Sequence, residues 1–184
     1  MTKKILKLNE HVRELFQHAK LIRLIDIEPM YQLQNMKKIK LCRNTKAPIK
    51  GCSWKSPTSQ FIVIDQTRFN VGIPTGRANG FLVIDVDVKK ENKLELDGMQ
   101  RVNQYELQHG VINTLTVRTP SGGLHYYFHL EEKNENVRYV IDEHLYNRSG
   151  IGGYSIDVRN EGGYIVAPGS VIDGKSYKIV NNAI

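Results

Sequence analysis

The sequence predicts a mixed α/β fold in which short strands carry the polar residues of interest. Residues 81–88 read Phe-Leu-Val-Ile-Asp-Val-Asp-Val, a short apolar run rich in β-branched residues that is typical of a buried strand. Residues 114–118 and 124–130 read as two strands around a tight Pro-Ser-Gly-Gly turn, which is the pattern of a β-hairpin. Residues 97–109 are expected to form a helix that Asp97 caps.

The composition fits a single intracellular domain with an acidic partner. The chain has 184 residues, of which 40% are hydrophobic and 24% are charged, and its formal net charge is +7. A positive excess on a domain of this size fits a polyanionic partner such as a nucleic acid. No run approaches the roughly 18 apolar residues of a membrane span, and no secretory core follows the N-terminus. Cys42 and Cys52 do not have the spacing of zinc ligands, so we expect no zinc.

The N-terminal part is expected to be a scaffold followed by a basic loop. Apolar residues in the range 5–28 have roughly helical spacing, and Asn9 could cap a helix over 10–20. The segment 38–60 is basic and contains Trp54, the single tryptophan. Such a loop could place cations on phosphates and a ring on a base, or be a solvated loop. For Trp54 itself, we favour a role as a core anchor.

The segment 69–80 is expected to form a short strand at Val71–Ile73 and then a Gly-rich turn. Glycines let backbone amides approach a ligand closely, and Arg77 could then reach a phosphate. A plain β-turn explains the same residues equally well.

Asp85 and Asp87 are the first candidates for chemistry. Because side chains alternate along a strand, both point the same way, with Cα atoms about 6.5–7 Å apart. Carboxylates this close repel each other, and a divalent cation such as Mg²⁺ would relieve the repulsion. The plain alternative is a strand that ends in acids as it reaches solvent.

The hairpin tip and a later segment supply the other candidates. Ser121, two glycines and His125 could form a donor cluster for a phosphate, although an ordinary turn is the alternative. Residues 154–159 and 164–167 look like paired strands around Asn-Glu-Gly-Gly, and Asp157 and Arg159 share one strand face. Three strand-borne acids with a cationic pocket suit a two-metal phosphoryl or nucleotidyl transfer site.

In their order and spacing, these blocks resemble the primase–polymerase (prim-pol) domain of the archaeo-eukaryotic primase superfamily. The resemblance covers about residues 40–180 and rests on three motifs: Val-Ile-Asp85-Val-Asp87, Thr-Pro-Ser121-Gly-Gly-Leu-His125-Tyr and Ile-Asp157-Val-Arg159. It implies an α/β (α+β) fold with an RRM-like antiparallel sheet, flanking helices and a small N-terminal helix–strand subdomain.

We therefore expect one catalytic domain over 1–184. Its parts would be an N-terminal helical part over 1–36, a basic N-terminal subdomain over 37–80 and a catalytic sheet over 81–184. Proteins of this family usually continue into a helical domain and often a helicase, so we expect a fragment of a longer replication protein. The implied setting is the cytoplasm, in a bacterial, phage or plasmid context.

The resemblance also implies an activity and the residues that carry it. The implied enzyme is a DNA-directed primase/polymerase, in which a 3′-hydroxyl attacks the α-phosphate of a dNTP or NTP and pyrophosphate leaves. Two Mg²⁺ or Mn²⁺ ions would be held by the catalytic acids Asp85, Asp87 and Asp157. The nucleotide would be bound by the catalytic His125 together with Ser121, Gly122, Gly123, Arg159 and Arg77. The basic loop would contact the DNA template or primer through Lys46, Lys50 and Arg43.

Two other classes of function remain open at this stage. A two-metal nuclease needs similar acids but no triphosphate pocket, so the Ser-Gly-Gly-Leu-His tip argues against it. A non-catalytic nucleic-acid-binding module of a replication initiator would need the basic residues but not the acids.

Overall fold

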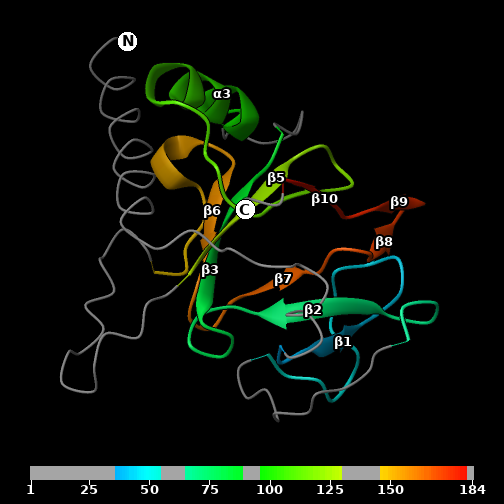
Figure 1. Cartoon of the computed structure of the whole chain (residues 1–184). Helices are drawn as coiled ribbons and strands as arrows, with labels where there is room; N and C mark the ends of the chain where they lie inside the picture. Colours follow the sequence, from blue (N-terminus) through cyan, green and yellow to red (C-terminus); the bar gives the residue numbers. More distant parts are fainter. Residues whose placement is uncertain (1–35, 55–64, 89–95, 130–145, 182–184) are drawn as a thin grey trace, which may run out of the picture.

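The computed structural model describes residues 36–54, 65–88, 96–129 and 146–181. Within these ranges the chain forms a five-stranded sheet, a three-stranded sheet and a two-stranded hairpin, all antiparallel, with one α-helix (Figure 1). The mixed α/β prediction is therefore confirmed. No helix in this described part is both long and apolar enough to cross a membrane. The helix predicted over 10–20 lies outside the described residues.

The five-stranded sheet is built around the predicted acidic strand. Its strand order is β10-β4-β5-β3-β6. The bounds are β3 Phe81–Val86, β4 Thr116–Arg118, β5 Leu124–His129, β6 Ile156–Arg159 and β10 Lys178–Asn181. The predicted strand 81–88 is confirmed as β3, although it ends at Val86. The predicted hairpin is confirmed as β4 and β5.

Helix α3 (Gly98–His109) packs against one face of this sheet. The Gln100 amide donates to Oδ1 of Asp97 at 2.7 Å, and Gly110 ends the helix with φ 85°. The predicted cap and end are thus confirmed. Val102 and Tyr105 of the helix bury Ile84 and the other apolar residues on that face of the sheet. Positions 82, 84 and 86 of β3 all belong to this core, so position 85 must face the other way.

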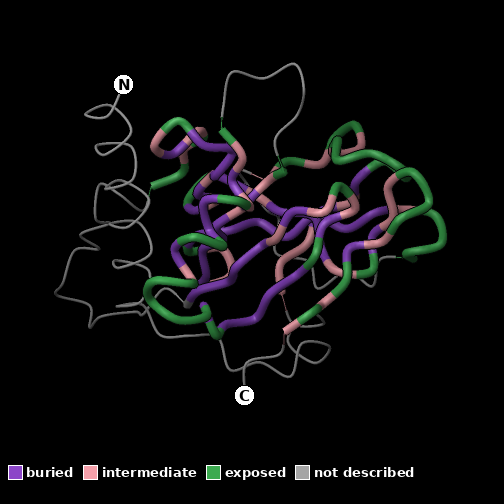
Figure 2. The backbone as a smooth tube through the Cα atoms, turned by 90° about the horizontal axis from the view of Figure 1, so that it is seen from above, coloured by how far each residue is buried: buried purple, intermediate pink, exposed green. Residues whose placement is uncertain are grey.

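The three-stranded sheet packs against part of the opposite face. Its order is β1 (Ile39–Leu41), β2 (Asn70–Pro74) and β7 (Tyr164–Val166). Phe81 and Val83 of β3 join Ile73 and Ile165 in the core between the sheets. Figure 2 shows that buried positions follow the chain through the interior of the molecule, while exposed positions lie mostly in the connecting loops and on one side of α3. Strand β3 is therefore covered on both faces over most of its length.

The predicted pairing of residues 154–159 with 164–167 is wrong. Both strands exist, but β6 pairs with β3, and β7 pairs with β2 in the other sheet. The turn Asn160–Gly163, closed by a 2.8 Å bond from the Gly163 amide to the Asn160 carbonyl, carries the chain between the sheets. The physical reason is that each strand completes a different core: Ile156 lies beneath α3, whereas Ile165 lies between the sheets. The remaining strands, β8 (Val171–Ile172) and β9 (Lys175–Ser176), form a short hairpin, and a 3₁₀ turn (Ile151–Gly153) precedes β6.

Candidate active site

Three neighbouring strands bring two acids and a histidine of the predicted site side by side. Asp85 of β3 lies directly opposite His125 of β5 on one side and Asp157 of β6 on the other. Residues directly opposite each other on antiparallel strands point to the same face, with Cβ atoms about 4.5–5.5 Å apart. The three side chains therefore lie on the face away from α3.

Asp85 lies between His125 and Arg159. Nε2 of His125 lies 3.3 Å from one carboxylate oxygen, and Nε of Arg159 lies 3.8 Å from the other. Burial by itself would raise the pKa of Asp85, because its side chain is only 15% exposed. The nearby positive charges of His125, Arg159 and Lys46 act in the opposite direction, and the net pKa lies below its ordinary value. Asp85 is therefore ionised at neutral pH.

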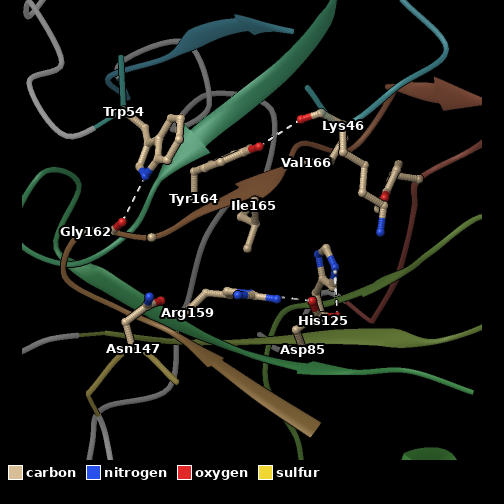
Figure 3. Close-up of a pocket in the computed structure, with 12 residues that line it drawn as sticks. Lys46, Trp54, Asp85, His125, Asn147, Arg159, Gly162, Tyr164, Ile165 and Val166 are labelled. Carbon is tan, nitrogen blue, oxygen red and sulfur yellow. Dashed lines mark hydrogen bonds and ion pairs between the residues drawn. The ribbon is translucent and has the colours of Figure 1, made fainter. Parts of the chain in front are cut away.

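Arg159 also binds the second acid. Its Nη2 lies 2.5 Å from Oδ2 of Asp157, and the Gly150 amide donates to Oδ1 of the same carboxylate at 3.0 Å. The guanidinium thus bridges the carboxylates of Asp85 and Asp157 (Figure 3 shows its approach to Asp85). The pair of acids already holds a cation, and that cation comes from the protein.

The His125 ring is held firmly. The residue is only 3% exposed, and its ring packs against Tyr177 with 5.6 Å between the centroids. Its Nε2 approaches Asp85, while Nδ1 has no hydrogen-bond partner among the described residues. In this arrangement the ring orients Asp85 and supports its negative charge.

A cavity of about 300 Å³ opens next to these groups, between the two sheets. Asp85, His125 and Arg159 line one side of it. Trp54 and Tyr164 lie across the cavity from them, and Lys46 lies near its other end (Figure 3). The site therefore combines a charged side with an aromatic side.

A comparison with protein families gives a match that spans most of the chain. The family model Prim-Pol, described as "Bifunctional DNA primase/polymerase, N-terminal", matches residues 29–183. The chain belongs to the Prim-Pol family. The resemblance predicted from the three motifs is thus confirmed, and primase/polymerase-type nucleotidyl transfer with DNA and nucleotide substrates is the activity typical of the family. No curated protein matches the chain.

The third acid predicted for this Prim-Pol domain lies just beyond β3. The Asp87 amide donates to the Ser155 carbonyl at 2.8 Å, and its carbonyl accepts from the Gly98 amide at 3.2 Å. Its side chain does not line the cavity. Among the described residues, no three His, Cys, Asp or Glu side chains are grouped so that they could hold a metal ion. The cluster of Asp85, Asp87 and Asp157 around two ions stays a prediction.

The hairpin tip of the Prim-Pol domain differs from the expected donor cluster. The Gly122 amide donates to the Thr119 carbonyl and the Gly123 amide to Thr119 Oγ1, both at 3.0 Å. Ser121 Oγ shares a 3.0 Å hydrogen bond with the same hydroxyl. A Cβ on Gly123 would lie 2.3 Å from the Val86 carbonyl oxygen, so only glycine lets the turn approach β3. These residues do not line the cavity, and their amides and hydroxyl bind Thr119 within the turn.

The predicted basic residues separate into two groups. Lys46 lines the cavity, and Arg43 and Lys50 are exposed on the same loop between β1 and Trp54. Arg77 is exposed outside the cavity, and its amide donates to the Glu161 carboxylate at 2.9 Å. The sequence interpretation missed Tyr164, Tyr177 and Asn147, which line the cavity. The only sequence signal near these three residues was the pair of glycines that precedes Tyr164.

The lowered pKa of Asp85 predicts how stability depends on pH. A carboxyl whose pKa is lower in the folded state stabilises the fold above its unfolded pKa of about 4, and this stabilisation disappears as pH falls through the folded value. Urea unfolding in EDTA should therefore show a stability gap between wild type and Asp85→Asn that is constant above about pH 5 and narrows below about pH 4. A gap that stays constant down to pH 2.5 would contradict the pairing of Asp85 with His125 and Arg159.

Proposed function

We propose that the cavity between the sheets is the active site of template-directed DNA synthesis in this Prim-Pol domain. One observation carries the proposal: Asp85 lines the charged side of the cavity and stands in register with Asp157 on the adjacent strand, and the guanidinium of Arg159 lies between the two carboxylates. Nucleotidyl transfer needs such a place, where fixed charges face the negative charge that develops on the phosphoryl group.

The residues present fit divalent metal ions in their donor chemistry. Carboxylate oxygens are the ligands that Mg²⁺ and Mn²⁺ prefer, and the guanidinium of Arg159 shows that the two carboxylates attract a cation. In the proposal, Asp85 and Asp157 hold the ions, with Asp87 as the third acid. The ions would supply positive charge to the attacking and leaving oxygens.

The other charged groups of the site take supporting roles. His125 keeps Asp85 ionised and oriented through the contact at Nε2. Arg159 and Lys46 are assigned to the triphosphate, because both line the cavity. Once metal ions neutralise the acids, the positive charges of these two side chains can attract the phosphates. The phosphate role first expected for Gly122 and Gly123 passes to these cations, since both amides already bind Thr119.

The order of the strands supports the RRM-like sheet that is part of the proposal. The order β4-β5-β3-β6, with α3 between β3 and β4 in the chain, is the order of an RRM-like sheet.

The proposal also includes DNA and a partner protein. Arg43 and Lys50 would contact the DNA backbone beside the cavity. A helicase domain or protein would act with this domain in replication of a mobile element or phage.

Primer extension tests the proposed function. A primed DNA template is incubated with the four dNTPs or the four NTPs and Mg²⁺ or Mn²⁺. One control reaction contains an unprimed template, and another contains unlabelled nucleotides and detects nuclease activity. We expect template-dependent extension in the primed reaction, and product from the unprimed template would add priming. Degradation of the primer without extension would instead support a nuclease. Folded protein that binds DNA but yields no product would support a binding module.

A further inference from the structure

Two aromatic rings form the side of the cavity that faces the charged residues. The centroids of Trp54 and Tyr164 lie 5.0 Å apart, and the ring planes are inclined by 49°. Both side chains are partly exposed and line the cavity across from Asp85 (Figure 3). The two residues come from distant parts of the chain, so this juxtaposition exists only in the fold.

The polar end of each ring is already anchored to backbone. Trp54 Nε1 donates to the Gly162 carbonyl at 3.0 Å, and the Tyr164 hydroxyl donates to the Lys46 carbonyl at 2.9 Å. Both rings are therefore oriented before any ligand arrives, which lowers the entropic cost of binding a flat ligand. Their hydrogen-bonding groups are used, so what they offer a ligand is aromatic surface.

The cavity as a whole matches the two chemical parts of a nucleotide. Its charged side, with Arg159 and Lys46, suits phosphates, and its aromatic side suits a base. Resting on the proposed function, we infer that Trp54 and Tyr164 form the subsite for the base of the incoming nucleotide. Stacking does not distinguish bases, because every base has a π-face. A template-directed enzyme needs that tolerance, since base identity must be chosen by pairing with the template.

The competing explanation is that the two rings only fill space. Both pack against the core between the sheets, so their loss would lower stability in either case. A purely structural role would leave the nucleotide affinity of folded variants unchanged. Nucleotide affinity therefore separates the two explanations, and stability does not.

Tryptophan fluorescence provides the first test, because Trp54 is the only tryptophan in the chain. Each of the four dNTPs, the four deoxynucleosides and a single-stranded oligothymidine is titrated into the protein, with N-acetyltryptophanamide as the optical control. We expect saturable quenching by all four dNTPs with affinities within about threefold of one another, and weaker quenching by the nucleosides. Quenching by the oligonucleotide alone would assign the rings to the DNA strand and overturn the inference.

A matched pair of variants provides the second test. Tyr164→Phe keeps the ring and removes the hydroxyl, whereas Tyr164→Leu removes the ring, and thermal unfolding and circular dichroism verify that both are folded. By calorimetry we expect Tyr164→Leu to weaken dNTP binding about tenfold and Tyr164→Phe to change it less than about twofold. Equal dNTP affinity in all three proteins would overturn the inference and leave the proposed function intact. Absence of dNTP binding to the wild type would overturn both, whereas ring-dependent binding without any synthesis would overturn the proposed function alone.

Discussion

Replacing Asp85 with asparagine is expected to reduce the rate of primer extension by about 10³-fold or more. The asparagine side chain is nearly isosteric, but it carries no negative charge to hold a metal ion beside the reacting phosphate. The substitution also removes the Asp85 carboxylate, which His125 and Arg159 both contact. Single-nucleotide incorporation under single-turnover conditions with Mg²⁺ or Mn²⁺ measures this effect.

A matched control is Asp173→Asn, which makes the same chemical change at an exposed position. Asp173 adopts φ 49° and accepts a bond from Asn44, and asparagine tolerates both that conformation and that bond. The rate of this control should stay within about twofold of wild type. If a folded protein carrying both Asp85→Asn and Asp87→Asn still extends a primer, the assignment of the acids is wrong.

Replacing Arg159 with glutamine is expected to lower the stability and the extension rate but to strengthen Mn²⁺ binding. Without the guanidinium, the carboxylates of Asp85 and Asp157 repel each other, so the metal-free protein should lose about 1–3 kcal/mol of unfolding free energy. The same repulsion favours a divalent ion, so Mn²⁺ should bind about tenfold more tightly. Extension should nevertheless fall about 10²-fold, because a cation assigned to the triphosphate is gone.

Urea unfolding in EDTA, Mn²⁺ titration followed by electron paramagnetic resonance and single-turnover extension measure the three effects. Arg118→Gln is the matched control, because it removes the same charge from an exposed position at the end of β4. A variant of Arg159 that binds Mn²⁺ more weakly than wild type would contradict the idea that the guanidinium occupies the metal position.

Local patterns were sufficient to predict the elements that carry the site. Asp97 and Gly110 fixed the ends of α3, because capping is decided by a few neighbouring residues. The short apolar run over residues 81–88 predicted a buried strand, and β3 is that strand, with Leu82, Ile84 and Val86 in the core beneath α3. The family assignment followed from three motifs in order, and the family match confirms it.

Features that depend on contacts between distant segments were not predictable in the same way. Nothing in the sequence separates a hairpin of residues 154–167 from two strands in different sheets, because both patterns share the same turn residues. The contact between Trp54 and Tyr164 joins positions 110 residues apart (164 − 54). The bridge made by Arg159 depends on side-chain rotamers, and the bonds of the Gly122 and Gly123 amides to Thr119 depend on the shape of one turn.

The most direct test is a crystal structure of the protein with Mn²⁺ and a non-hydrolysable dNTP, recorded with anomalous scattering from manganese. We expect an anomalous peak within about 2.0–2.6 Å of carboxylate oxygens from both Asp85 and Asp157, with Arg159 moved onto the triphosphate. Manganese and triphosphate bound elsewhere, with Arg159 still bridging the two acids, would contradict the proposed active site.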